Sequence, residues 1–274
     1  MLGAARVVVG LFALAACGRM HFDELVDAGG TTWGAPVVRL ELQGDTSEED
    51  PSVSADRLTI VWSTDRSGTL GAFDVWMATR ASRTAPFENL RNLTEINSAT
   101  YEGSPEISPD GLTLLFASEV GGQSDIFMST RPMLSSPWGA PVRRDDLSSS
   151  IDDFELAIAP DGLTVIINRD GDFVELTRPD VGASFGAETS HPELHIANDV
   201  ASPTIDNGAR TIYFHAGAIR DLYVAHRTSG GTFSAPIPVA ELDTPNREAD
   251  PFMSADDRYL VFNCGVDICE VERE

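Results

Sequence analysis

Acidic side chains recur at two fixed positions in this sequence, and they are the residues best suited to chemistry. Each position is counted back from the start of a short apolar segment, either one residue before it or three residues before it. Carboxylate oxygens are the ligands that hard cations such as Ca²⁺ prefer, and clustered carboxylates also attract basic protein surfaces. The acidic residues at these positions are Glu48, Asp50, Glu102, Asp153, Glu155, Glu248 and Asp250.

The elements that must position these carboxylates are five copies of one repeat. An aromatic residue precedes each apolar segment by 18 residues, and an aspartate followed six residues later by an arginine also recurs. The pairs of aromatic residue and segment start are Trp33/Pro51, Phe87/Pro105, Trp138/Leu156, Phe185/Pro203 and Phe233/Pro251. The Asp/Arg pairs are Asp74/Arg80, Asp125/Arg131, Asp172/Arg178, Asp221/Arg227 and Asp267/Arg273, and we expect them to fix the third strand of each repeat.

The second copy shows the local structure most clearly. An inner strand, Glu106–Ser108, runs into the turn Pro109-Asp110-Gly111, and strands over 112–118, 125–130 and 138–142 follow. Four-stranded units at a period of 47 to 54 residues predict the blades of a β-propeller.

The ends of the chain set the number of blades. Trp33 to Val37 forms a fourth strand without the first three, and Asp250 to Glu274 supplies three strands without a fourth. The two ends therefore complete one blade between them, which hides the sheet edges of an open array. We predict an all-β fold, a five-bladed β-propeller over residues 33–274, closed by the N-terminal strand.

Loop lengths indicate where function lies. From the large apolar residue of the second strand to the aspartate of the third, the spacings are 12, 9, 5, 7 and 5, while other segments stay nearly constant. These loops share one face with the connections that lead into the inner strands, and we name it the working face. The seven carboxylates are predicted to ring the channel mouth on this face, as solvated strand caps, a docking rim for a basic partner, or a Ca²⁺ site.

The repeat resembles the TolB-type, WD-like propeller repeats of bacterial envelope proteins. The residues that carry the resemblance are Ser104-Pro105, Ser108-Pro109-Asp110-Gly111, Phe116-Ala117-Ser118 and Asp125-Ile126-Phe127. It covers roughly Trp33 to the C-terminus, and it implies a propeller fold without implying one function, because such folds serve many.

The N-terminus has the layout of a secretory signal. Residues 1–16 carry a single charge, Arg6, before the apolar run Val7–Ala16, which is too short to span a bilayer. Leu14-Ala15-Ala16-Cys17-Gly18 resembles a bacterial lipobox, which implies cleavage before Cys17, its lipidation and an outer-membrane destination; an ordinary signal peptide is the alternative. We expect residues 17–32 to form a flexible tether.

Charge restricts the partners. Acidic residues outnumber basic ones 43 to 19, for a formal charge of −24. Such a surface repels nucleic acid and anionic lipid headgroups and favours basic partners. We expect a monomer that binds an envelope protein with a basic surface, contacts the membrane only through its lipid anchor, and binds no nucleic acid.

Other motifs give weaker signals. His191 and His195 lack the helical setting of a zinc motif, so we expect no metal ligands there and no resident cofactor, with Ca²⁺ at the rim as the alternative. Cys264 and Cys269 flank a hairpin and are a candidate disulfide of an exported protein. We assign no catalytic residue and expect a non-catalytic protein-binding or scaffolding module. A glycan-binding or glycan-cleaving propeller is the alternative, and only Glu106 and Asp206 on its inner strands are acidic.

Overall fold

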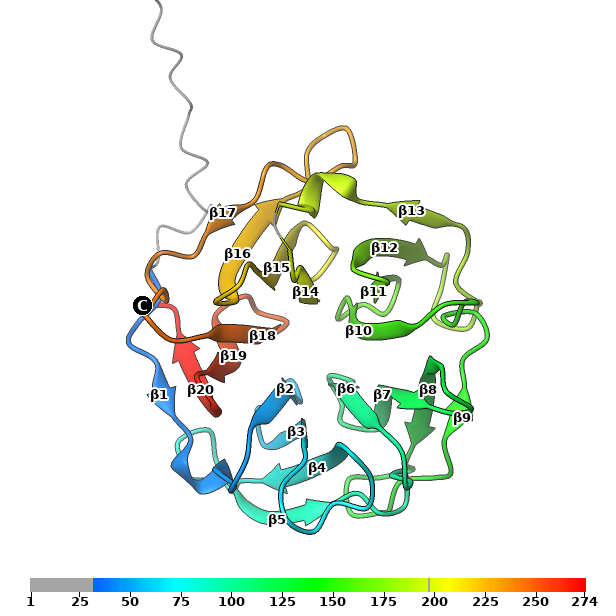
Figure 1. Ribbon diagram of the computed structural model, residues 1–274, viewed down its shortest axis with the longest axis vertical. Coiled ribbons are helices and arrows are strands. Elements are labelled where there is room, and N and C mark those ends of the chain that lie inside the picture. The colour runs from blue at the N-terminus through cyan, green and yellow to red at the C-terminus, as the bar shows by residue number, and fades with distance from the viewer. Residues whose placement is uncertain (1–31, 197) are drawn as a thin grey trace, which may run out of the picture. The chain divides into compact units, whose positions relative to one another are not determined.

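Five four-stranded antiparallel sheets surround a central channel (Figure 1). The computed structural model describes residues 32–196 and 198–274; the predicted signal peptide and Cys17 lie outside this part of the chain. Within it, no helix is long and apolar enough to cross a membrane. The all-β, five-bladed fold predicted from the repeat is confirmed.

Each blade is a meander whose first strand lines the channel. The first three blades are β2 (Glu48–Val53), β3 (Thr59–Thr64), β4 (Asp74–Thr79) and β5 (Glu88–Asn92); β6 (Glu102–Ile107), β7 (Thr113–Glu119), β8 (Ser124–Thr130) and β9 (Val142–Arg143); and β10 (Asp153–Ile158), β11 (Thr164–Arg169), β12 (Asp172–Thr177) and β13 (Glu188–Ser190). The last two are β14 (Ala201–Ile205), β15 (Thr211–Ala216), β16 (Asp221–His226) and β17 (Ile237–Pro238); and β18 (Glu248–Met253), β19 (Tyr259–Cys264), β20 (Asp267–Glu272) and β1 (Val37–Val38). Short 3₁₀ turns, η1 (Leu40–Leu42) and η2 (Pro192–Leu194), lie in two of the connections between blades.

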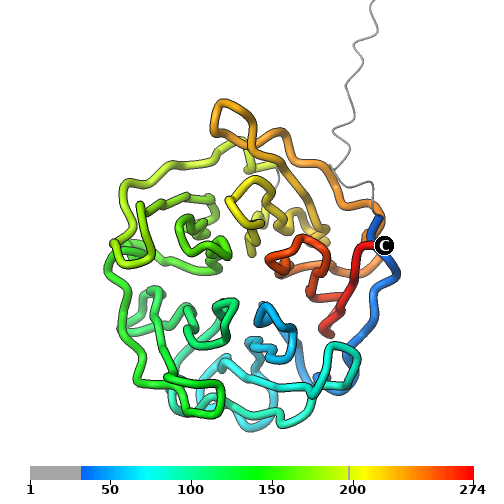
Figure 2. The backbone as a smooth tube through the Cα atoms, turned by 180° about the vertical axis from the view of Figure 1, so that it is seen from behind, coloured from blue at the N-terminus to red at the C-terminus, as the bar shows by residue number. Residues whose placement is uncertain are grey.

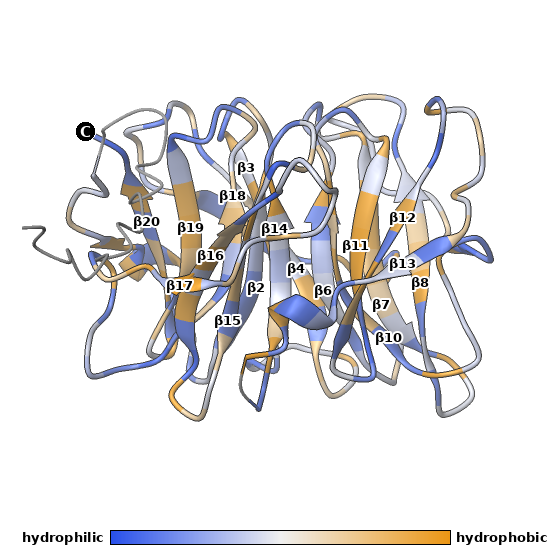
Figure 3. Ribbon diagram, turned by 90° about the horizontal axis from the view of Figure 1, so that it is seen from above, coloured by the Kyte–Doolittle hydropathy of each residue, from blue (hydrophilic) through white to orange (hydrophobic). Residues whose placement is uncertain are grey.

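The hydrophobic core lies between the blades, divided into five clusters. The large apolar side chain of each second strand is almost fully buried, as the repeat requires for stacking. These side chains are Trp62, Phe116, Ile167, Phe214 and Phe262. Viewed from the side, the strands run between two layers of loops, one of which is the working face (Figure 3).

An arginine stacked on an aromatic ring holds the outer part of every blade. In the first blade the Arg80 guanidinium lies 4.3 Å from the Phe87 ring centre, and its Nε donates to the Arg57 carbonyl of the turn after the inner strand. The other stacks are Arg131/Trp138, Arg178/Phe185, Arg227/Phe233 and Arg273/Trp33, at 4.3 to 4.5 Å. The arginines of the predicted Asp/Arg pairs thus act through a cation–π contact, while their aspartates have different partners in different blades.

The ring closes as predicted, because β1 pairs with β20 through Val37 opposite Glu270 and Val38 opposite Cys269. The N-terminal and C-terminal strands lie side by side in Figures 1 and 2. Trp33 extends this pairing through its bridge to Arg273 and its stack under that guanidinium. Glu270 also accepts hydrogen bonds from Arg80 of the first blade, at 2.8 and 3.2 Å, which ties the seam to its neighbour.

Replacing Trp33 by alanine should open the ring at this seam. The loss of a buried indole costs about 3–5 kcal/mol in the free energy of unfolding. Here it also weakens the attachment of the N-terminal strand, which is held to β20 only by non-covalent contacts. We expect a lower urea midpoint together with early proteolytic cleavage within residues 33–40. Trp138→Ala removes the equivalent stack inside a continuous part of the chain and is the control: it should lower the midpoint without that cleavage. Equal protease resistance of both variants would contradict a seam at Trp33.

Candidate functional site

A β-bulge in each inner strand turns one side chain into the channel. The register shifts once in every pairing of first and second strands, and the residue at the shift has a positive φ although it is not glycine. Such backbone costs on the order of 1–3 kcal/mol per residue and gathers where function requires it. The bulge residues are Asp50, Ser104, Glu155, Ser202 and Asp250, with φ of 50°, 49°, 28°, 50° and 50°.

Hydrogen bonds between neighbouring bulges join the blades around the channel. The Ser104 amide donates to Asp50 Oδ2 at 3.3 Å, and the Ser202 amide donates to Glu155 Oε2 at 3.0 Å. The Ser202 hydroxyl in turn donates to Asp250 Oδ1 at 2.9 Å. The carboxylates therefore satisfy backbone donors of the next blade while they face the channel.

These five side chains and the residues after them line a small cavity, which we name the channel mouth. Its volume is about 30 Å³, room for on the order of two water molecules and too little for a sugar ring. The residue after the bulge is proline in four blades, and proline carries no N–H. The wall consequently offers mainly oxygen acceptors, which suits a cation or a hydrogen-bond donor.

The three acidic bulge residues differ in how their charge is balanced. Burial, and then repulsion from Asp250, Glu155 and Glu49, raise the pKa of Asp50 well above its usual value. Burial also acts to raise the pKa of Asp250, but the hydrogen bond and charge of His215, the charge of Arg247 and the Ser202 hydroxyl outweigh it and lower that pKa. Among the described residues, neither Asp50 nor Glu155 forms an ion pair. The mouth thus holds two carboxyl groups without an ion-pair partner, and burial together with the neighbouring carboxylates favours the neutral form of Asp50, which an incoming cation would ionise.

The predicted rim divides into two groups in the structure. Asp50, Glu155 and Asp250 line the mouth. Glu48, Glu102, Asp153 and Glu248 are at most 1% exposed, because they belong to the inner strands and point away from the channel. The backbone amides of Ser98, Ser149 and Thr244 donate to Glu102, Asp153 and Glu248, four residues on in each case, and Arg66 pairs with Glu48. These four side chains therefore cap strand starts inside the protein.

Glu106 occupies the second level of the channel. It lines both the mouth and the cavity beneath it, and it accepts hydrogen bonds from the Ser52 hydroxyl, at 3.4 Å, and from the Ile158 amide. Burial outweighs these bonds and raises the pKa of Glu106 to about 8.

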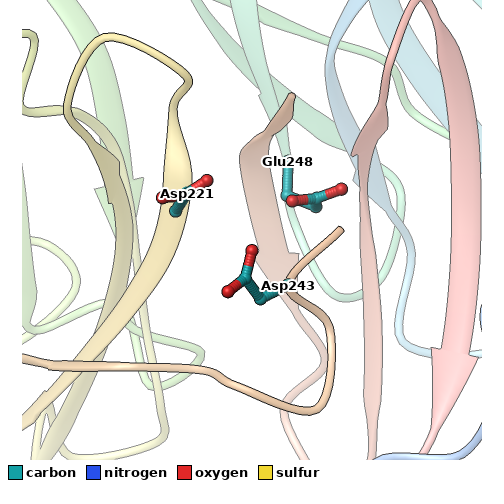
Figure 4. Close-up of side chains that lie close together, drawn as sticks. All are labelled: Asp221, Asp243 and Glu248. Atoms are coloured by element: carbon teal, nitrogen blue, oxygen red, sulfur yellow. The ribbon is translucent and has the colours of Figure 1, made fainter. Parts of the chain in front are cut away.

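Three further carboxylates converge at the junction of the fourth and fifth blades. Asp221, Asp243 and Glu248 point toward one another, and their oxygens lie within 4.8 Å (Figure 4). Burial and then the charge of Asp243 raise the pKa of Asp221. Burial and the charges of Asp221 and Asp243 raise the pKa of Glu248 and outweigh the hydrogen bonds from Thr244, which act to lower it. At the first junction Asn97 holds the place of Asp243, and its amide bonds both the amide and the carbonyl of Val75, at 3.0 and 2.9 Å. Asp243 has no side-chain N–H and cannot donate the hydrogen bond that Asn97 donates to a backbone carbonyl. Its charge instead repels those of Asp221 and Glu248.

Other candidate motifs are part of the scaffold. His191 is buried, with its ring nitrogens 3.1 and 2.9 Å from Glu175 and Glu193, whereas the exposed His195 faces Asp172. A disulfide joins Cys264 to Cys269 across the β19–β20 hairpin, with Cα atoms 5.8 Å apart. The segment Gly182-Ala183-Ser184-Phe185-Gly186 has the spacing of a nucleophile elbow. It lies in a loop between two strands rather than between a strand and a helix, so it lacks the elbow geometry.

Comparisons with known proteins identify the fold. No protein-family model and no curated protein matches the chain. TolB from Acinetobacter baumannii matches with a TM-score of 0.52 and 17% identity, over 84% of this chain and 55% of that one. The chain has a TolB-like β-propeller fold. It spans only about half of that TolB.

Sugar-cleaving propellers share the architecture equally well. An α-L-arabinofuranosidase from Podospora anserina, solved with cellotriose, matches with a TM-score of 0.57 and 12% identity, over 89% of this chain and 96% of that one. The catalytic domain of the Coprinopsis cinerea enzyme gives 0.57 at 14% identity, with the same coverage. At these identities the likeness concerns the fold alone.

Removing the charge of Glu106 should change how stability depends on pH. The folded protein keeps this proton up to about pH 8, whereas the unfolded chain releases it near 4.5, so wild-type stability falls as pH rises between them. Glu106→Gln should match the wild type near pH 5 and exceed it at pH 9 by on the order of 3 kcal/mol in the free energy of unfolding. The control Asp110→Asn removes a negative charge that the hydrogen bond from Ser108 stabilises and whose pKa that bond lowers, so the difference should have the opposite sign. Parallel pH profiles of Glu106→Gln and wild type in urea titrations would refute this.

Asp243→Asn should stabilise the protein. The change removes one of three facing charges and restores an amide where Asn97 braces the first junction. We expect a gain of about 0.5–1 kcal/mol, measured by urea unfolding. A lower midpoint would contradict this, and a calcium-dependent rise seen only in the wild type would show that the three carboxylates hold a cation instead.

Proposed function

We propose that this protein is a non-catalytic propeller lipoprotein of the bacterial cell envelope that binds a partner protein with a basic surface. The observation that carries the proposal is the uneven charge of the two faces. The loops of the working face, counted as those between second and third strands and the six residues before each inner strand, hold six acidic and three basic residues. The acidic residues of the mouth add to this excess, whereas the loops of the opposite face and the chain ends hold eight acidic and nine basic residues.

The arginines of the working face do not offset its carboxylates for an incoming partner. Arg66 is buried against Glu48, and Arg220 pairs with Asp199 at 2.7 Å. Arg247 bridges Glu49 and Asp250, at 3.2 and 3.0 Å. Unbalanced carboxylates on one face speed the encounter with a basic protein and orient it there.

The alternative, a glycan-cleaving propeller, rests on the three carboxylates of the channel mouth. A glycosidase needs two carboxyl groups that flank a bound sugar. The mouth is too small for a sugar ring, and Asp250 is engaged with His215, Arg247 and Ser202. We therefore expect no release of arabinose from arabinoxylan. Release that Asp50→Asn and Glu155→Gln both abolish would favour the glycosidase instead.

A zero-length cross-linker that joins carboxylates to amines tests the binding function directly. The sequence contains no lysine, so each amide that the reagent forms with an internal residue of this chain joins one of its carboxylates to a partner's amine. In envelope extract, a triple variant of the working face, Asp50→Asn, Glu155→Gln and Asp243→Asn, should lose the cross-linked product. A matched triple variant of the opposite face, Asp110→Asn, Asp161→Asn and Asp180→Asn, should keep it. Loss in both, or in neither, would overturn the assignment to this face.

Anchoring is tested by Cys17→Ser. Acyl chains contribute about 0.8 kcal/mol per buried methylene, so the loss of the lipidated cysteine should move the protein into the soluble fraction. Retention of the variant in the membrane pellet after a salt wash would rule out a lipid anchor at this residue.

A further inference from the structure

Exposed aliphatic side chains stand on the working face in a ring drawn from every blade. They are 41 to 59% exposed, and each lies in a loop between second and third strands or just before an inner strand. About half of the surface of each of these side chains remains in contact with water in the monomer, and a molecule bound on this face would cover it. The ring consists of Leu70, Val120, Ile151, Ile196, Ile219 and Val266.

The opposite face differs. Its exposed aliphatic side chains in the described chain are Met133, Leu134 and Val181, which lie in two neighbouring loops of the second and third blades. The remaining ones belong to the outer strands, such as Val37 and Val142, except Leu40, which lies in the turn η1 between β1 and β2. A ring that encloses the channel is therefore particular to the working face.

Aromatic rings stand between this ring and the channel mouth on one side. Phe73, Tyr101 and Phe154 form a row with centroid distances of 6.1 and 6.4 Å, and each is partly exposed. The Tyr101 hydroxyl bonds Ser104 beside Asp50, and burial followed by the charge of Asp50 raises its pKa. Aromatic faces next to a carboxylate favour a cation that is partly removed from water.

We propose that the working face binds a protein segment that places one primary ammonium group in the channel mouth and apolar side chains on the aliphatic ring. This deepens the proposed function and rests on it. Asp50 and Glu155 have no ion-pair partner among the described residues, the four prolines contribute no N–H to the wall, and the volume fits an ammonium group. A charged contact at the centre with an apolar surround that excludes water is the arrangement of a binding hot spot.

Short peptides with a single lysine serve as the probe. The first flanks the lysine with leucines, the second flanks it with serines, and the third carries trimethyllysine, which keeps the charge but has no N–H and is bulkier. Fluorescence anisotropy should give the leucine peptide a dissociation constant at least tenfold below those of the other two. Cross-links of its amine should map to Asp50 or Glu155 and not to carboxylates of the opposite face.

Variants of the protein separate the two parts of the interface. Asp50→Asn keeps a residue type that tolerates positive φ and should weaken the leucine peptide about tenfold or more. The pair Val120→Ser and Ile219→Ser should weaken the leucine peptide and leave the serine peptide unchanged. Met133→Ser and Val181→Ser on the opposite face are the control and should change neither.

Equal affinity for all three peptides, or cross-links spread over both faces, would overturn the proposal. If the working-face variant loses the cross-linked product in extract while the three peptides bind with equal affinity, the proposal of a basic partner is supported and the proposal of an ammonium site is wrong. If the peptides discriminate as expected while the extract yields no product, the site stands and the envelope partner is wrong.

Discussion

The whole molecule depends on closure of the ring by two chain ends that no covalent bond joins. Val37 and Val38 pair with β20, and Trp33 stacks under Arg273 at 4.5 Å. A two-residue strand contributes little pairing by itself, so the stack and the Glu270 ion pairs supply much of the seam. Because every inner strand takes its place from its neighbours, closure also fixes the diameter of the channel.

Closure creates the second constraint, which is crowding at the axis. Five inner strands that converge on one channel must direct side chains and backbone amides toward the same small space. The bulges meet this demand, because each turns one acceptor side chain inward where Ser104 and Ser202 of the adjacent blades donate their amides. The hydrogen bonds donated by the Ser104 and Ser202 amides thus offset part of the strain of the five left-handed residues and join their blades to the neighbouring ones.

The repeat explains which features the sequence could predict. Five copies of an aromatic residue, an apolar strand and an arginine determine the blades and their closure, since each residue has the same task in every copy. The positions of the acidic side chains at the channel are harder to predict from the sequence, because regular alternation along a strand places Glu48 and Asp50 on the same face of the sheet. The bulge separates them, and a positive φ at serine or glutamate has no signal in residue type. Ser104 and Ser202 occupy the same column of the repeat as the three acidic bulge residues, which the proline after each serine marks, and they line the channel through hydroxyl groups.

Variation among the copies separates scaffold from site. The arginine stacks are alike in all blades, and the acidic strand caps recur in four of them, so these residues serve the fold. At the bulges the backbone is constant while the side chain changes between carboxylate and hydroxyl, and only Asp250 has cations beside it. Structure alone does not require that asymmetry, because five serines would accept the same amides. The proposed interaction uses that asymmetry, because Asp50, which has no ion-pair partner among the described residues, lies at the centre of an acidic, partly apolar face.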